Sequence, residues 1–280
     1  MGVTHIMRGE EFISSTPKFL SLYEALGITP PHFATMPVVL GPDGKKKLSK
    51  RDGAKDVLAY RDEGYLPEAV VNFLALLGWH PEGDKEVLTV EELIHEFNVA
   101  KLQKGGAKFD ETKLTWFNHE HIKRLSDDAF VQRLTDYLHA PTSMPAYLPQ
   151  ISGLLKERSR TLADAAQAIS GGEFSFLEET IATPSPDLVL QGSKSDAATV
   201  RMHLQKARDL LQDQDAAQFS AEQVKECIFP YATEVGRSAV LWPLRVALSG
   251  MEKSPDPFML AELLGKQRTL SRIEQALQVL

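Results

Sequence analysis

The sequence lacks the features on which secreted, metal-clustered and membrane proteins depend. Cys227 is the only cysteine in 280 residues, so neither an intrachain disulfide nor a thiolate metal cluster can form. No apolar run approaches the roughly 20 residues of a membrane helix, and no segment resembles a secretory signal. Internal repeats and long low-complexity tracts are also absent. These absences predict a soluble protein of the cytoplasm.

The composition is that of a globular chain with a modest acidic excess. Its 31 Lys and Arg against 38 Asp and Glu give a net charge of −7, which argues against a protein that coats nucleic acid over its whole surface. A local basic patch on an acidic body is compatible with that total. The 43% hydrophobic content supports a sizeable core, and 280 residues suggest about two domains.

The secondary-structure signals change from mixed to purely helical near residue 55. Before it, β-prone runs at 3–7 and 36–40 flank a helix that begins at Thr16-Pro17 and ends at Gly27. This order predicts a piece of an α/β domain, because two strands alone make a poor sheet. Beyond it, caps at Thr89, Asp110 and Ser126 and helices at 67–77, 147–157, 161–169, 196–212, 220–229, 243–249, 257–264 and 269–279 are expected.

A basic segment at 41–55 is the most unusual local feature. It contains six Lys or Arg against two Asp, a net charge of +4 in an acidic chain. Its glycines allow it to bend, and a lysine on such a loop is a good point-charge ligand for a polyphosphate. Composition alone favours a solvated loop. A Walker P-loop is excluded, because Gly41 and Gly44 are too close and Lys45 is followed by another lysine.

The residues within this segment carry a more specific signal. Lys47-Leu-Ser-Lys-Arg51 resembles the KMSKS-type loop of class I aminoacyl-tRNA synthetases. Eight further segments resemble glutamyl-tRNA synthetase in order and spacing, and together with 41–44 they cover essentially the whole chain. They are Met1–Glu11, Ser15–Lys18, Leu22–Gly27, Gly64–Ala69, Leu74–Trp79, Arg158–Leu162, Leu241–Leu248 and Lys253–Phe258.

One family motif has no counterpart. The family carries a HIGH-type motif on an N-terminal Rossmann half, whereas His5 and His32 stand in unrelated contexts. The resemblance therefore implies the C-terminal part of the enzyme, inactive without an N-terminal catalytic half as its partner. It also implies a mainly α fold. The expected parts are a Rossmann remnant with the KMSKS-type loop at 1–55, a helical connecting domain that contacts the tRNA stem at 56–140, and a helical anticodon-binding domain at 141–280.

The resemblance assigns roles in activation chemistry. The family attaches glutamate to its tRNA through a glutamyl-adenylate made from ATP with Mg²⁺, and no metal is expected to bind this chain alone. Lys47, Ser49 and Lys50 match the catalytic loop, and Lys50 and then Lys47 are the expected ATP contacts. Phe12 is expected to pack beside adenine. Arg8 matches the arginine that holds a carboxylate of glutamate, a task suited to its planar fork.

Plainer interpretations of some of these residues stay open. Arg8 can be a surface arginine paired with Glu10, and Phe12 can be an ordinary core aromatic. Leu48 is expected to anchor the loop. His119-Glu-His121 has metal-ligand residue types, but its place near a helix end favours two surface histidines.

The resemblance also assigns roles in tRNA recognition. Arg158, Arg245 and Ser254 match positions near the anticodon, and Arg158 matches the one near the third anticodon base, which separates glutamate tRNA from glutamine tRNA. Trp242 is a candidate for stacking on a base, although its place before a proline also fits burial. Lys253 is expected to contact phosphate.

Two functions from different classes follow. The first is the C-terminal part of a glutamate–tRNA ligase, and the second is a free-standing tRNA-binding module without activation chemistry. The KLSKR sequence and Arg8 favour the first, because a pure anticodon binder needs neither. A regulatory basic-loop protein without tRNA is disfavoured, because it leaves the C-terminal matches unexplained.

Overall fold

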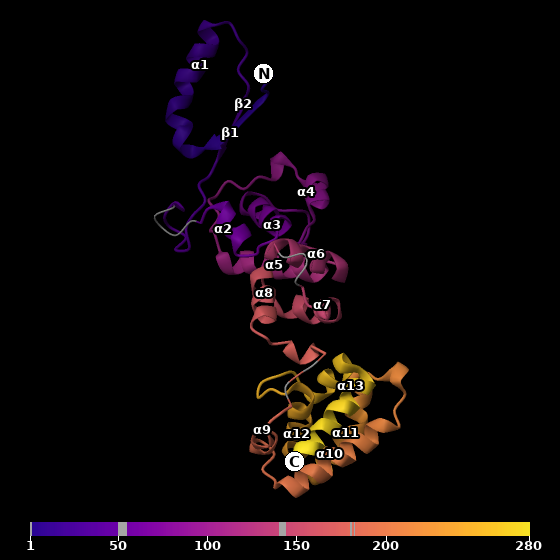
Figure 1. The fold of residues 1–280 in the computed structure, drawn as a ribbon. Helices are drawn as coiled ribbons and strands as arrows, with labels where there is room; N and C mark the ends of the chain where they lie inside the picture. Colours follow the sequence, from indigo (N-terminus) through magenta and orange to yellow (C-terminus); the bar gives the residue numbers. More distant parts are fainter. Residues whose placement is uncertain (1, 50–54, 140–143, 180, 182) are drawn as a thin grey trace. The chain divides into compact units, whose positions relative to one another are not determined.

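The computed structural model describes residues 2–49, 55–139, 144–179, 181 and 183–280 (Figure 1). The chain divides into two compact units. The first comprises Met1–Pro141 and Leu154–Ala165, and the second comprises Thr142–Gly153 and Ala166–Leu280. Helices dominate both, and the described residues form only one two-stranded sheet, so the predicted mainly α fold is confirmed. The domain boundary predicted at residue 55 stays a prediction.

The sheet is a parallel pair of strands in the first part of the chain, where the sequence predicts a piece of an α/β domain. Strand β1 (His5–Gly9) pairs with β2 (His32–Met36). Parallel strands need a crossover connection, and here it is formed by the 3₁₀ helix η1 (Glu10–Ser15) and the helix α1 (Thr16–Ala25). Helix α1 has its proline in the first turn, where the missing N–H costs nothing.

The second strand lies earlier than predicted. The expectation of a strand over 36–40 is wrong, because β2 ends at Met36. Pro37 follows directly and has no N–H to donate to a ladder. Of residues 37–40, only Leu40 forms β-type pairs, as isolated bridges. The apolar run at 36–40 is therefore not a strand, and its last residue pairs in isolated bridges with Lys47 and Lys108.

The rest of the first unit is helical and contains an aromatic core. Its caps at Thr89, Asp110 and Ser126 are confirmed, and Thr89 forms a full capping box with Glu92. The core is built around Phe73, Trp79 and Phe117. The helices are α2 (Val57–Asp62), α3 (Pro67–Gly78), α4 (Val90–Glu96), η3 (Val99–Lys101), α5 (Glu111–Arg124) and α6 (Asp127–Leu138). The residues of α7 (Leu148–Arg158) and α8 (Leu162–Ser170) are divided between the two units, at Leu154 and at Ala166.

The second unit is a bundle in which α12 and α13 pack together and against α10 and α11. Its elements are η4 (Ser175–Leu177), α9 (Pro186–Gln191), α10 (Ala197–Gln212), η5 (Ala216–Gln218), α11 (Ala221–Val235), α12 (Arg237–Ser249) and α13 (Pro257–Val279). The predicted helix start at Pro243 is wrong, since this proline lies inside α12. Pro243 is buried there, so packing of the surrounding apolar face outweighs the lost hydrogen bond. The predicted break between 264 and 269 falls at Gly265, whose φ is 71°.

One predicted surface residue is buried. His121 lies on the core face of α5 with 8% of its surface exposed, so the expectation of two surface histidines is wrong for it. Its Nε2 donates to Oδ1 of Asn72 at 3.0 Å. Burial, helped by the charge of Arg124, lowers the pKa of His121 below 6.5. Burial likewise lowers the pKa of His203 in the second unit.

These histidines predict a loss of stability in mild acid. In the unfolded chain each takes up a proton near pH 6.5, whereas in the folded chain uptake is delayed to lower pH, so the unfolded state binds more protons in between. The free energy of unfolding should therefore be constant with respect to these histidines above about pH 6.5. Below that pH it should fall by at most about 1.4 kcal/mol per pH unit for each histidine. Urea unfolding between pH 7.5 and 5.5 measures this. His121→Gln should flatten the slope, and the exposed His80→Gln should not.

Candidate functional site

The basic segment begins as a tight hairpin. The amide of Leu48 donates to the carbonyl of Val39 at 2.8 Å, and the amide of Gly41 donates to that of Lys46 at 2.8 Å. Within the turn, Oδ1 of Asp43 accepts the amides of residues 45 and 46, and these bonds lower the pKa of Asp43. Gly44 adopts a φ of 67°, which an L side chain strains to reach. The turn leaves its first two lysines exposed.

Lys47 is the lysine that the hairpin brings to the end of β1. Its Nζ lies 2.9 Å from Oε1 of Glu11, and this hydrogen bond lowers the pKa of Glu11. The other carboxylate oxygen of Glu11 lies 2.1 Å from where a Cβ on Gly9 would be, so only glycine allows the carboxylate to fold back here. Ser49 is half-buried and engaged in an interaction. Lys50 lies outside the described residues.

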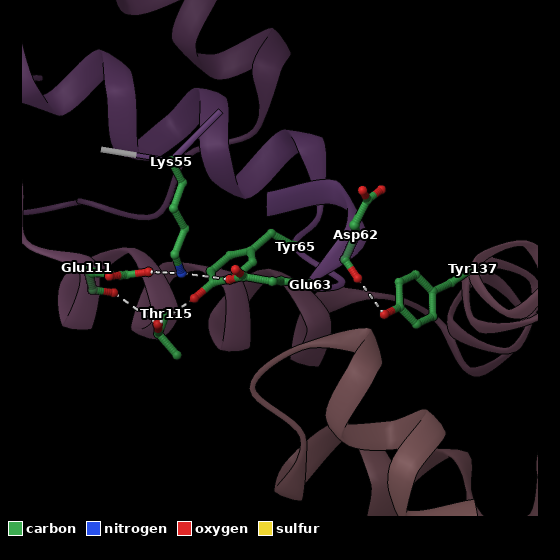
Figure 2. A network of polar contacts seen from close by, with 7 residues as sticks. All are labelled: Lys55, Asp62, Glu63, Tyr65, Glu111, Thr115 and Tyr137. Carbon is green, nitrogen blue, oxygen red and sulfur yellow. Dashed lines mark hydrogen bonds and ion pairs between the residues drawn. The ribbon is translucent and has the colours of Figure 1, made fainter. Parts of the chain in front are cut away.

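Contacts fix the described chain on both sides of residues 50–54. Leu48 lines an apolar cavity of about 160 Å³ together with residues of α2, α3 and α5, in line with its expected anchoring role. Lys55 donates to carboxylates of Glu63 and Glu111 at 2.9 and 2.5 Å (Figure 2), and both raise its pKa, Glu111 more strongly. Figure 2 also shows the hydroxyl of Tyr65 beside that of Thr115, 2.8 Å apart.

Arg8 lies in an aromatic cage on β1. Its Cζ is 5.3 Å from the ring centroids of Phe19 and Phe33 and 5.6 Å from that of Phe12, within cation–π range. Its Nη2 donates to Oγ1 of Thr16 at 2.7 Å. No carboxylate among the described residues forms an ion pair with it, so the alternative of pairing with an acidic neighbour gains no support. The cage holds the guanidinium without neutralising its charge.

Arg158 lies at a surface pocket of about 670 Å³ in the first unit. Its neighbour Ser159 is buried, and the carbonyl of Ser159 accepts from Nδ1 of His119 at 2.8 Å. The next carbonyl, of Arg160, accepts from Nδ2 of Asn118 at 2.6 Å. The pocket lining comprises Glu111, Thr112, Thr115, Trp116, His119, Glu157, Arg158 and Arg160. Helix α5 thus positions the backbone from which two exposed arginines project.

Sequence reasoning missed Asn118. It is fully buried, and its Oδ1 also accepts the amide of Leu66 at 2.7 Å. The signal was present, because Asn118 is four residues from both Leu114 and Ile122 and so shares their buried face. A polar residue on such a face needs a specific partner.

Three of the predicted tRNA-binding residues gather in the second unit. Arg245 donates through Nη1 to Oγ of Ser254 at 3.1 Å and through Nη2 to the carbonyl of Glu252 at 2.7 Å. Its Cζ lies 4.6 Å from the ring centroid of Trp242. Burial lowers the pKa of Arg245. Lys253 is exposed beside this cluster. Stacking of Trp242 on a base stays a prediction, since its ring here contacts Arg245.

Metal-ligand clusters and membrane-spanning helices are both absent from the described ranges. No three His, Cys, Asp or Glu side chains there gather as metal ligands. Nor does any helix in those ranges combine the length and apolarity needed to cross a bilayer.

Family models match two stretches of the chain. Residues 1–116 match the catalytic domain of class I tRNA synthetases (E and Q). Residues 129–277 match an anticodon-binding domain, which is more than half of the chain. The second stretch contains Arg158 and the Arg245 cluster, and the first contains Arg8 and Lys47.

Individual relatives agree with these matches. A glutamate–tRNA ligase 1 of Alkalilimnicola ehrlichii is 37% identical over 99% of this chain, and a glutamate–tRNA ligase of Moorella thermoacetica is 35% identical over 99%. A crystal structure of a glutamate tRNA ligase from Elizabethkingia meningosepticum in complex with its amino acid aligns with a TM-score of 0.74 at 34% identity. It too covers 99% of this chain. The chain spans 56–57% of the length of these proteins.

Proposed function

Since the chain belongs to the glutamyl-tRNA synthetase family, we propose that it works as part of an enzyme that attaches glutamate to tRNA. In this proposal the chain supplies the KMSKS-type loop and the reading of the anticodon. The observation that carries it is the cluster of Arg245, Ser254 and Trp242. The resemblance to the family assigns these three residues to tRNA binding, and they lie together within the stretch that matches the anticodon-binding domain.

The cluster suits recognition of a single-stranded base. Arg245 donates one hydrogen bond to Ser254 and one to the carbonyl of Glu252, and these two bonds fix the plane of the guanidinium. Its remaining N–H groups can donate to a ligand. A fixed donor fork reads acceptor atoms on a base edge, and bases splayed from a loop expose those edges. Lys253 beside it adds attraction for phosphate.

The pocket at Arg158 suits a second base contact. Arg158 and Arg160 flank a buried residue whose backbone is fixed from α5, so their direction is set by the fold. Trp116 on the pocket wall is 43% exposed and offers an aromatic face. In this proposal Arg158 reads the third anticodon base, as the resemblance implies.

The activation half of the proposal rests on Arg8 and the basic loop. Adenylate formation builds negative charge on the α-phosphate and the departing pyrophosphate, and positioned cations stabilise it. Lys47 and Lys50 would supply them, with Ser49 as a hydroxyl donor, to ATP that carries Mg²⁺. Arg8 would bind a carboxylate of glutamate, with its cage holding the fork in place, and Phe12 would lie next to the adenine.

Binding of two tRNA transcripts tests the anticodon part of the proposal. The wild-type chain should bind glutamate tRNA in preference to glutamine tRNA, and Arg158→Gln should reduce that preference about tenfold. A correct base contact is worth ~1–3 kcal/mol, and ~1.4 kcal/mol is a factor of ten. The two dissociation constants are measured at two salt concentrations.

Lys253→Ala is the matched control for a phosphate contact. It should weaken both tRNAs alike and lower the salt slope by about one. An unchanged ratio in Arg158→Gln rejects Arg158 as the base reader and passes the role to Arg245. Equal binding of unrelated tRNAs by the wild-type chain rejects anticodon reading itself.

A further inference from the structure

Gly192 ends α9 at a point where its backbone does not need a glycine. Its φ and ψ are −98° and −2°, so it lies outside the positive-φ region that favours glycine. A Cβ built on Gly192 would nevertheless lie 2.2, 2.4 and 2.6 Å from Cδ2, Cε2 and Cε3 of Trp242. A point so near three adjacent fused ring atoms lies over the face of the ring. Glycine is therefore required here by the indole ring and not by the backbone.

The same turn of α9 also holds the edge of that ring. Nε1 of Trp242 donates to the carbonyl of Leu188 at 3.0 Å. The carbonyl sets the direction of the indole, and the bare Cα of Gly192 sets how closely the ring approaches α9. A short helix thus fixes a side chain of α12 from 50 residues earlier in the chain.

The ring in turn supports Arg245. The guanidinium lies over the Trp242 ring, with Cζ 4.6 Å from its centroid, and Arg245 is three residues further along α12, on the same face. Its two side-chain bonds to Ser254 and Glu252 come from the following loop. The ring and the loop therefore set the guanidinium plane together, and a displaced ring moves it.

We propose that Gly192 and Trp242 are positioning residues that set the aim of the Arg245 donor fork toward an anticodon base. This inference rests on the proposed function for its ligand. Gly192 determines how far the ring stands from α9, the ring determines the plane of the guanidinium, and the plane determines which base edge the remaining donors meet. Trp242 acts through Arg245 and need not touch the tRNA.

Gly192→Ala tests the arrangement with one added methyl group. The methyl should displace the ring, shift the indole N–H resonance of Trp242 in a ¹H–¹⁵N spectrum, and weaken binding of a glutamate tRNA transcript about tenfold, the size of one base contact. Trp242→Phe assigns the resonance. Gly153→Ala is the control, because Gly153 is an exposed glycine of the same unit with open space at its Cβ. It should change neither readout.

A double-mutant cycle separates positioning from a merely structural role. If Gly192 acts through the guanidinium, Gly192→Ala should cost little further affinity once Arg245→Ala is present. A full additional tenfold loss in that background overturns the proposal, as does an unshifted indole resonance in Gly192→Ala. Should Gly192→Ala unfold, Trp242→Leu removes the ring without adding bulk and must show the same non-additivity. If the wild-type chain binds no tRNA, the proposed function fails while the indole shift still tests the stack.

Discussion

Glutamate-dependent pyrophosphate exchange is expected to be undetectable with the purified 280-residue chain. Adenylate formation requires ATP and glutamate to be held against each other, and such positioning supplies about 7–11 kcal/mol of barrier lowering in well-organised sites. The sequence contains no HIGH-type motif, and the chain spans 57% of the length of its Alkalilimnicola relative. In the proposed function, Arg8 and the KLSKR loop would contact only parts of the reactants and would not complete a site around them.

Exchange of labelled pyrophosphate into ATP measures this, with a full-length glutamate–tRNA ligase of a relative as the positive control. A Lys47→Ala variant guards against host enzyme, because contaminating activity is indifferent to it. Robust exchange that Lys47→Ala abolishes would contradict the prediction.

Adding a HIGH-bearing portion of a relative distinguishes the two functions. Restored pyrophosphate exchange would favour the first function, the C-terminal part of a glutamate–tRNA ligase. Binding of tRNA without any restored exchange favours the free-standing tRNA-binding module.

The elements that could be predicted from the sequence are those set by local contacts. Caps such as Thr89 and Asp110 act within one turn, and Thr16-Pro17 starts α1 for the same reason. The predicted position of the second strand was wrong, because β propensity at 36–40 does not show whether another strand is available to pair with that run. The predicted helix start at Pro243 was wrong, because proline is common in the first turn of a helix and local sequence favours that position. Whether a proline is tolerated inside a helix depends on how it packs against other helices, and Pro243 is buried.

The candidate site shows the same limit. Candidate roles for Arg8, Lys47 and Arg245 could be predicted from the sequence because the family resemblance supplies them. Their partners are not, since Lys47 meets Glu11 across 36 residues and Trp242 meets Gly192 across 50. Such contacts depend on tertiary packing, which no local pattern encodes.

Asn118→Ala is expected to destabilise the first unit by about 3 kcal/mol, and to alter tRNA discrimination as well. The side chain is fully buried and joins the amide of Leu66 to the carbonyl of Arg160 at 2.7 and 2.6 Å. Removing it leaves the buried amide of Leu66 and the partly buried carbonyl of Arg160 without this partner, at ~1–3 kcal/mol for a fully buried group and less for a partly exposed one. Because the carbonyl belongs to the segment that carries Arg158, its release should also loosen the aim of that arginine. Urea unfolding measures the first effect.

Asn72→Ala is the control that separates the two effects. Asn72 is equally buried, with Nδ2 donating to the carbonyl of Glu86 at 3.0 Å and Oδ1 accepting from the amide of Leu88 at 2.9 Å and from Nε2 of His121 at 3.0 Å. Its loss should cost similar stability, but its partners do not adjoin Arg158. Asn118→Ala should therefore shrink the ratio of affinities for glutamate and glutamine tRNA at a temperature where both variants are folded, and Asn72→Ala should leave it unchanged. A ratio that moves equally in both variants would tie discrimination to general stability, and one that moves in neither would remove Asn118 from tRNA recognition.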